Sequence, residues 1–500
     1  MSAKEQFSGR WGLILASLGM AIGAGNLWRF PRLAGQYGGT FLILWLLFLI
    51  IWSIPLLLAE FSIGKRYKKG VIGSYANFAG KRFAWGGWFI TLCTLGIAFY
   101  YSVVTGWGLR YLVLALQNVW AGITGGERIG DKLVENPDYL NDFWVSVSYS
   151  SVATVILHIF AVAFGAYILY KGIQKGLEKA NKILIPGLFV LLFIIMILSL
   201  SMEKGYLGLE YMFAINTDHF SNPKVWLEAL SQSAWSTGAG WGLIMTISSY
   251  SRDKEDVTLN TFVSAFGNNT ASLLAGLAIL PAVFALSSNE IEAVSFLESG
   301  SQALTFTIIP KLFSGFALGW VFTGVFFLAF FMAAFSSLLP MIELFIRNLT
   351  DLGITRGGSV VRAAIFCVIF GLPSAWSLDF FSNQDWVWGL GLIISGILIM
   401  GAVIKYGVFE FKKQFIDADS DFKVSKYYFG IFIYLNIFLG LFLIYWWMSQ
   451  GYSENPWFSP EGNWNMFDIY SNASVITQWA IILVSGILLN KWIYTKFGKS

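Results

Sequence analysis

The chain has few of the residues from which enzymes and metal-binding proteins build their sites. Its 500 residues include two cysteines, two histidines and only 12% charged residues, whereas a soluble domain has about 25% charged residues. Cys93 and Cys367 both lie in apolar runs, so we expect neither a disulfide framework nor a cysteine metal site. His158 and His219 are far apart in sequence, which argues against a histidine-rich metal site.

His158 lies alone in an apolar run, where it is either a packed, hydrogen-bonded histidine or a proton relay. The apolar runs contain no pair of acids, His–Cys cluster or nucleophile–base set, so the chain is not expected to be an enzyme. We expect no nucleic-acid partner. A cleavable signal peptide is not expected either, because the first apolar run continues into Arg-Phe-Pro rather than a cleavage region.

Long apolar runs dominate the sequence. Hydrophobic residues make up 56% of the chain, and its 22 tryptophans and 21 tyrosines suit interfacial belts and aromatic-lined sites. Runs of about 20 apolar residues are long enough to cross a bilayer. The sequence therefore predicts an all-α integral membrane protein with twelve spans, at about 11–34, 40–64, 84–116, 148–170, 181–201, 225–250, 258–286, 315–348, 359–378, 386–408, 427–449 and 473–494.

The distribution of positive charge predicts the orientation. If the N-terminus is inside, most lysines and arginines lie in cytoplasmic segments, which is the usual arrangement. Both termini are then cytoplasmic, in a multi-pass protein of the plasma membrane. The four long loops, at about 117–147, 202–224, 287–314 and 450–472, lie outside. The loop at 287–314 has an amphipathic pattern and is either a solvated loop or a lid over a central vestibule.

Two of the spans are interrupted by glycine. Span one contains AIGAGNLWRFP (21–31), and span six contains SAWSTGAGWG (233–242). Irregular backbone is tolerated inside a membrane only where protein buries it or where it lines a cavity. If spans 1–5 and 6–10 are repeats, the two breaks occupy equivalent places, which is the best sequence indication of a transporter binding site.

A broken helix exposes polar backbone in the middle of the membrane. Its carbonyl groups, with Asn26 and nearby hydroxyls, can replace the water around a small hard cation, and its N–H groups can hold a carboxylate. The simpler alternative is that the glycines only allow helices to pack closely. That alternative does not explain why Asn26, Arg29 and Pro31 follow at once.

These stretches resemble the neurotransmitter:sodium symporter family, as in a bacterial member of it. The resemblance covers the whole chain. It is carried by GLILASLGMAIGAGNLWRFP (12–31), GGTFLILWLLFLIIWSIPLLLAEFSIGKR (38–66), ILYKGIQKGLEKANKI (168–183), TISSYSRDKED (246–256) and AAFSSLLPMIE (333–343).

The resemblance implies the leucine-transporter fold, with two inverted five-helix repeats, broken helices 1 and 6, and two added helices. The expected segments are a cytoplasmic N-terminal latch (1–10), the first repeat (11–201), the second repeat (225–408), helices 11–12 (427–494) and a cytoplasmic tail (495–500). It also implies a Na⁺-coupled symporter that imports a neutral amino acid by alternating access, as a monomer or a homodimer.

The resemblance further implies two sodium sites made of neutral oxygens. The first would use the Ala21 carbonyl, Asn26, Ser236, Asn268 and the carboxylate of the substrate. The second would use carbonyls of Gly19, Ile22 and Ala333 with the hydroxyls of Ser336 and Ser337. Taken alone, neighbouring serines in a helix more often bond back to their own backbone.

Substrate contacts and gates follow from the same resemblance. The substrate would contact Ala21, Gly25, Tyr101, Trp235, Ser236, Gly238, Trp241, Ser337 and Met341. An outer gate would combine the pair Arg29 and Asp385 with a lid of Tyr101 and Trp235, although Asp385 could also be an ordinary loop acid. An inner gate would use Lys4, Phe7, Ser249, Tyr250 and Asp351, and Glu60 would support the broken sixth helix.

Two features bear on the ligands. Amine transporters of the family have an aspartate where this chain has Gly23, so an amino acid is the better prediction. A chloride site is a further hypothesis, formed by Trp45, Gln232, Ser236, Asn268 and Ser272, with Trp45 in place of the family's tyrosine.

Three other functions stay open. A proton-coupled carrier of the same fold would need an ionisable side chain at the sodium positions, which hold neutral oxygens instead. A channel would show a repeated filter or ring-forming residues. A sensor that binds Na⁺ and an amino acid without transport has no sequence signature that separates it from a symporter.

Overall fold

The computed structural model describes residues 5–316, 318–450 and 453–498, and nearly all of them are helical. Within these ranges the only β-type pairing is an isolated bridge between Phe458 and Trp464. The all-α prediction is thus confirmed. Lys4, a predicted gate residue, lies outside the described residues.

The described residues of the first half of the chain form ten α-helices. Their bounds, with the short π- and 3₁₀-helices between them, are α1 (Arg10–Ala21), α2 (Ala24–Phe48), η1 (Leu49–Ser53), α3 (Ile54–Tyr67), α4 (Val71–Ala79), η2 (Lys81–Phe83), α5 (Trp85–Thr124), α6 (Ile129–Glu135), α7 (Tyr139–Ser148), α8 (Val152–Tyr170), η3 (Ile173–Glu178), α9 (Lys179–Leu200), α10 (Gly205–Phe213) and η4 (Thr217–Ser221).

The second half begins with another broken helix. Its elements are α11 (Pro223–Thr237), α12 (Leu243–Ser249), α13 (Val257–Leu286), α14 (Glu290–Glu298), α15 (Ser301–Ala303), η5 (Leu304–Ile308), α16 (Ile309–Ser314), α17 (Gly319–Asp351), α18 (Arg356–Trp376), α19 (Leu378–Tyr406), α20 (Val408–Phe411), η6 (Lys412–Ile416), η7 (Asp417–Asp419), α21 (Lys426–Ser449), α22 (Asn472–Leu488), α23 (Asn490–Ile493) and η8 (Tyr494–Gly498).

The described part of the chain has nine helical stretches long and apolar enough to cross a membrane, or ten if α22 and the bent segment after it form one span. Predicted spans one and six are not among them as single helices, because each is divided into shorter pieces. Spans one and two also share α2, which kinks at Gly38 (φ 59°). A side chain there would lie 2.6 Å from the Ala214 carbonyl oxygen. The count of twelve stays a prediction.

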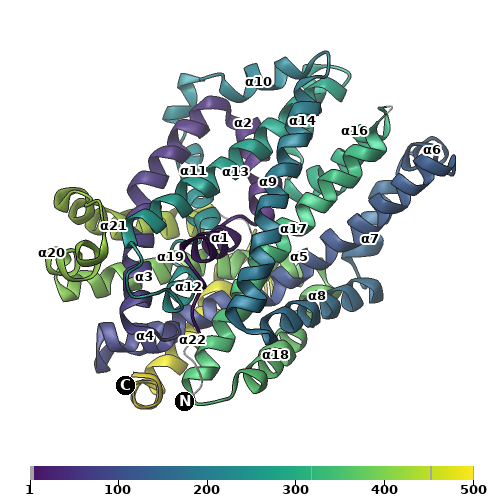
Figure 1. Cartoon of the computed structure of the whole chain (residues 1–500). Coiled ribbons are helices and arrows are strands. Elements are labelled where there is room, and N and C mark those ends of the chain that lie inside the picture. The colour runs from purple at the N-terminus through teal and green to yellow at the C-terminus, as the bar shows by residue number, and fades with distance from the viewer. Residues whose placement is uncertain (1–4, 317, 451–452, 499–500) are drawn as a thin grey trace.

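The described part of the chain begins and ends at the same end of the molecule, near α4 and α22 (Figure 1). Helices α6, α10, α14 and α16, which belong to the long loops, lie at the opposite end. The amphipathic loop at 287–314 is indeed partly helical. An even number of membrane crossings would produce this arrangement of the termini.

Helices α1 and α12 lie near the centre of the bundle, and both pack against α17. Helices α8, α9, α18 and α21 lie at the periphery and expose apolar side chains such as Phe160, Phe193, Phe366 and Phe438. Helix faces that expose many apolar side chains in this way suit contact with lipid. The polar backbone at the two breaks is therefore surrounded by helices and kept away from the hydrocarbon.

The last segment of the described chain folds back onto α4. The helix axis turns by 62° between α22 and Asn490–Gly498, so the predicted span 473–494 is shorter than expected. Asn490 accepts a hydrogen bond from Trp85 N–H and donates one to the Lys81 carbonyl. Ile493 and Phe497 then pack in a small apolar cluster with Ile72.

Candidate functional site

The first break lies between α1 and α2. Ile22 (φ −83°, ψ 99°) and Gly23 (φ −121°, ψ −172°) are extended, which separates the carbonyl end of α1 from the N–H end of α2. The Asn26 side chain accepts the Gly23 N–H over 2.9 Å, and the Tyr101 hydroxyl accepts the Ala24 N–H over 2.9 Å. The predicted interruption is real, and polar side chains stabilise it.

The second break, residues 238–242, contains three glycines with positive φ. Gly238, Gly240 and Gly242 have φ values of 70°, 91° and 72°, a region that favours glycine. The N–H groups of Gly240 and Gly242 both donate to the Glu60 carboxylate, the second over 2.8 Å. Glu60 is 0% exposed. It supports the broken helix as predicted.

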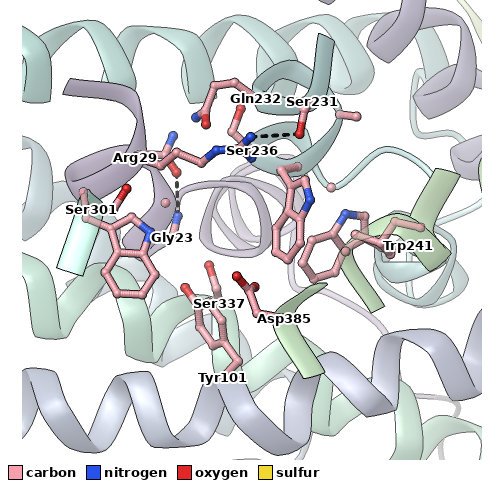
Figure 2. A pocket seen from close by; sticks show the side chains of 18 of the residues that line it. Gly23, Arg29, Tyr101, Ser231, Gln232, Ser236, Trp241, Ser301, Ser337 and Asp385 are labelled. Carbon is pink, nitrogen blue, oxygen red and sulfur yellow. Dashed lines mark hydrogen bonds between the residues drawn. The ribbon is translucent and has the colours of Figure 1, made fainter. Parts of the chain in front are cut away.

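The two breaks border one cavity of about 420 Å³ (Figure 2). All nine residues predicted to contact the substrate line it: Ala21, Gly25, Tyr101, Trp235, Ser236, Gly238, Trp241, Ser337 and Met341. The lining of the cavity also includes Arg32 of α2 and the segment Gly300–Gln302, which follows α14 in the chain. The cavity thus extends towards the end of the molecule opposite the two termini.

Oxygens of the first predicted sodium site meet beside this cavity. Asn26 Nδ2 donates to Asn268 Oδ1 over 2.8 Å. In that orientation Oδ1 also faces the Ala21 and Ser236 carbonyl oxygens, at 3.1 and 2.9 Å. If the amide is reversed, its nitrogen donates to both carbonyl oxygens and its oxygen accepts from Ser236 Oγ. This donor set fits Na⁺.

The second predicted set gathers between α1 and α17. Ser337 Oγ lies 3.0 Å from the Gly19 carbonyl oxygen and 3.2 Å from that of Ile22. Ser336 Oγ lies 3.3 Å from the Ile22 carbonyl oxygen and 2.9 Å from that of Ala333. Two hydroxyl protons cannot serve all these acceptors. The surplus of buried, neutral oxygens again fits a hard cation.

The predicted outer pair is not formed in this conformation. Arg29 Nη2 lies 2.9 Å from Glu228 Oε2 and also donates to Ser231 Oγ. Asp385 accepts instead from the Tyr100 hydroxyl over 2.9 Å. Figure 2 shows Asp385 and Arg29 on opposite sides of the cavity. Asp385 is not a loop acid, because it lies within α19 and lines the cavity.

The sequence interpretation missed Glu228. A signal for it was present, because Glu228 precedes Trp235 by seven residues, or two helical turns, and so shares its face of α11. An acid in an apolar span that faces the site is a functional candidate by default. It was missed because the resemblance already supplied Asp385 as the partner of Arg29.

The Arg29–Glu228 pair should favour an open cavity. Replacing Glu228 with glutamine removes the charge that holds Arg29 there, so Arg29 becomes available to Asp385 across the cavity. We expect the substrate to bind about fivefold more tightly, because a coupling free energy of about 1 kcal/mol between gate closure and substrate binding corresponds to that factor. Equilibrium binding of a labelled substrate measures this. Asp385→Asn is the matched control and should weaken binding; a shift in the same direction for both variants would contradict the prediction.

The predicted inner gate lies at the other end of the bundle. Phe7 is buried, its N–H donates to the Tyr250 carbonyl over 3.1 Å, and its ring packs edge-on against the Tyr250 ring. The Tyr250 hydroxyl donates to Glu343, which is also paired with Arg356 at 2.8 Å. These contacts tie the described start of the chain to the end of α12 and to α17.

Two other predicted gate residues make separate contacts. Asp351 accepts the Gly70 N–H over 2.7 Å and thereby holds the start of α4. Among the described residues, the hydrogen bond of the Ser249 hydroxyl goes to the Thr246 carbonyl of its own helix. Glu5 adds an ion pair of 2.7 Å with Arg356, and burial raises the pKa of its carboxyl although this guanidinium opposes the shift.

The hypothetical chloride residues include unused donors. Within the described chain, neither Trp45 Nε1 nor the Gln232 side-chain amide has a hydrogen-bond partner, and both are buried. Ser272 Oγ accepts from Asn26 Nδ2 over 2.7 Å, which leaves its own proton to donate. Ser236 Oγ and Asn268 lie 3.1 Å apart. The donor types suit an anion.

Comparison with known proteins adds independent information. The sequence model of the Sodium:neurotransmitter symporter family matches residues 4–136 and 141–499. An uncharacterized sodium-dependent transporter of Bacillus subtilis, YhdH, is 28% identical over 431 residues, which are 84% of each chain. An uncharacterized sodium-dependent transporter of Methanocaldococcus jannaschii is 31% identical over 363 residues, 70% of each chain.

Among solved structures, the crystal structure of MhsT in complex with L-phenylalanine matches with a TM-score of 0.73 and 27% sequence identity. The match covers 89% of this chain and 98% of MhsT. MhsT has the leucine-transporter fold, so the predicted fold class is confirmed.

Proposed function

This chain belongs to the sodium:neurotransmitter symporter family, whose members are sodium-coupled membrane transporters, and we propose that it imports a neutral amino acid together with Na⁺. One observation carries the proposal: both helix breaks and two sets of buried neutral oxygens meet at a single cavity. The L-phenylalanine bound to MhsT supports an amino acid as the substrate class.

Coupling follows from a shared ligand. The oxygens of Ala21, Asn26 and Asn268 would hold one Na⁺, and the carboxylate of the amino acid would complete its coordination. The N–H groups at the start of α2 favour the same carboxylate. Since neither ligand is fully coordinated without the other, each increases the affinity for the other by the same factor.

Gly23 supports a substrate with its own carboxylate. A side chain at this position would lie 2.6 Å from the Tyr101 hydroxyl and 2.9 Å from Ser337 Oγ. Because this position holds a glycine and not an acid, it supplies no carboxylate beside the proposed Na⁺ ligands, and the substrate would supply the negative charge. The α-carboxylate of a neutral amino acid would do so.

Alternating access would use both gates. Phe7 and Tyr250 would keep the N-terminal side closed, while Asp385 lines the cavity. Binding would bring Tyr101, Trp235 and the pair Arg29–Asp385 over the substrate. Loss of the Na⁺ held by Ser336 and Ser337 would then free α1 to open the other side. Each step requires that the ligands bind one state better than the other.

Chloride dependence is part of the proposal as a separate element. Trp45, Gln232 and Ser272 offer donors for an anion next to the first Na⁺ set, and a bound anion would offset the charge of the cation. Replacing chloride with gluconate at constant Na⁺ should slow uptake. Equal uptake in the two anions would remove chloride from the mechanism and leave Na⁺ coupling intact.

The multi-pass membrane location follows from the family and the apolar helices. We propose that this membrane is the plasma membrane. Both termini would lie in the cytoplasm, because the lysine- and arginine-rich segments are predicted on the same side of the membrane as the termini. The protein would work as a monomer or a homodimer in the bilayer.

The deciding experiment is uptake of labelled amino acids into proteoliposomes, with and without an inward Na⁺ gradient. Na⁺-driven accumulation of one class would support the symporter and name its substrate. Na⁺-dependent binding without accumulation would favour a sensor, and accumulation driven by a proton gradient alone would favour a proton-coupled carrier. Substrate accumulation that ignores Na⁺ would contradict the proposed roles of Asn26 and Ser336.

A further inference from the structure

The predicted second span contains a π-turn, η1, and Pro55 explains it. In an α-helix the Ile51 carbonyl would accept the N–H of residue 55, but proline has no N–H. The Ile54 N–H donates to the Leu49 carbonyl, five residues earlier, and so not to Ile50. The carbonyl groups of Ile50 and Ile51 are therefore both left without their helical donors. Inside a bilayer no water replaces such donors.

Helix α21 supplies the two missing donors. The Tyr428 hydroxyl donates to the Ile50 carbonyl over 2.6 Å. The Asn436 Nδ2 donates to the Ile51 carbonyl over 2.8 Å. Asn436 is 0% exposed, and its own side-chain oxygen has no partner among the described residues. This asparagine thus serves as a donor, which explains why an otherwise apolar helix carries an amide here.

A glycine lets α21 come close enough to make these contacts. The helix packs against η1 and α3 (Figure 1). A Cβ on Gly440 would lie 3.1 Å from Trp52 Cη2, which is tighter than an ordinary contact. Trp52 belongs to η1 and borders the cavity. A helix at the periphery of the bundle therefore reaches the surroundings of the site through a single turn.

The π-turn is bonded in turn to the sixth helix. Ser53, the last residue of η1, places its Oγ 3.1 Å from the Ser233 carbonyl oxygen and 2.9 Å from Ser233 Oγ. Ser233 lies on α11, about one turn before Ser236. The helix that follows η1, α3, carries Glu60, which binds the second break. The π-turn thus sets the position of α11 and of the second break from one place.

We propose that Asn436 is a positioning residue for the first proposed Na⁺ set. It holds η1, η1 holds α11 through Ser53, and α11 carries Ser236, whose Oγ lies 3.1 Å from Asn268. The inference rests on the proposed function and adds to it a residue that does not line the cavity. Without the amide, the Ile51 carbonyl would be buried unpaired, and η1 would shift towards another donor and move Ser53 with it.

The test separates Na⁺ affinity from maximal rate. Uptake of a labelled equimolar mixture of neutral amino acids into proteoliposomes is measured as a function of Na⁺ concentration. Asn436→Leu keeps a side chain of similar size and removes the donor. We expect it to raise the half-saturating Na⁺ concentration about tenfold. The maximal rate at saturating Na⁺ should stay within about twofold of the wild type, because the transport machinery itself is unchanged.

Ser53→Ala tests the route by which Asn436 acts. If Asn436 acts through η1 and Ser53, the double variant should need no more Na⁺ than the more affected single variant, to within about twofold. Effects that multiply in the double variant would show two independent routes and would overturn the inference.

Tyr434→Phe is the matched control. Tyr434 lies two residues from Asn436, on the opposite side of α21, and is 57% exposed. Its half-saturating Na⁺ concentration should equal that of the wild type. If Asn436→Leu fails to fold, Tyr428→Phe removes one hydroxyl from the same turn. It should raise the half-saturating Na⁺ concentration about threefold, and the comparison with Ser53→Ala is then made with this variant.

An unchanged half-saturating Na⁺ concentration in Asn436→Leu and Tyr428→Phe would overturn the inference. A lower maximal rate with unchanged Na⁺ affinity would also overturn it, since that result indicates a general structural role. Both results leave the proposed function intact. Uptake by the wild type that does not depend on Na⁺ would overturn the proposed function together with this inference. A Na⁺ shift that is absent in Tyr434→Phe and that Ser53→Ala does not increase supports the role of Asn436.

Discussion

Glu60→Ala is expected to reduce transport by more than about 100-fold. The carboxylate is 0% exposed and accepts the N–H groups of Gly240 and Gly242, two residues whose positive φ places them outside any helix in this structure. Two buried donors left without acceptors cost about 1–3 kcal/mol each. The second break should then lose its shape, and with it the position of Ser236 and Trp241. Uptake per amount of purified protein, with thermal stability in detergent, measures the effect.

Two control variants test the reason for this loss. Glu60→Gln keeps one acceptor oxygen and should retain more transport than Glu60→Ala. Ser62 lies on the same helix, is buried, and bonds only to the Leu58 carbonyl of its own helix, so Ser62→Ala should transport at close to the wild-type rate. A Glu60→Ala protein with normal uptake would show that the Glu60 contacts do not hold the second break.

Gly23→Ala is expected to lower Na⁺-dependent substrate binding by about 100-fold. The new Cβ would lie 2.6 Å from the Tyr101 hydroxyl and 2.9 Å from Ser337 Oγ, distances that force both side chains to move. Overpacking of this kind costs about 1–3 kcal/mol. It would disturb the substrate lid and the second Na⁺ set together. Binding of labelled Na⁺ and of labelled amino acid should therefore both fall.

Gly25→Ala separates the two effects. A Cβ at Gly25 meets no heavy atom within 4 Å, although Gly25 lines the cavity. The methyl group would occupy cavity space near the start of α2, so amino-acid affinity should fall about tenfold through lost fit. Binding of Na⁺ alone should not change. Equal losses of both ligands in both variants would contradict this account of the first break.

The sequence was most informative where the local backbone chemistry is unusual. Glycines in apolar runs, followed by Asn26 and Pro31, predicted the first break, and three glycines predicted the second. Both breaks are present. The second requires positive φ, which glycine adopts readily, and the first has Gly23 where a side chain would collide with Tyr101. The family resemblance then indicated the residues that line the cavity, and the structure brings them together there.

The sequence was less informative about pairing between side chains from distant elements. Arg29 could have reached either Glu228 or Asp385, and only the packing of α2 against α11 decides which. The bend after α22 depends in the same way on contacts of Asn490 with Lys81 and Trp85, about 400 residues earlier in the chain. Helix ends are also poorly determined by composition, and α19 begins eight residues before the predicted span at 386.

The shortness of α1 has a consequence for the biogenesis of the protein. A helix of 12 residues is about 18 Å long, less than the hydrocarbon thickness of about 30 Å. Its final partner on α17 is encoded far downstream, since Gly19 and Ser337 are 318 residues apart. At about 5–20 residues per second, the ribosome needs about 15–60 s to make that stretch. During this time the first helix has to stay in the membrane without the neighbours that later cover its open end.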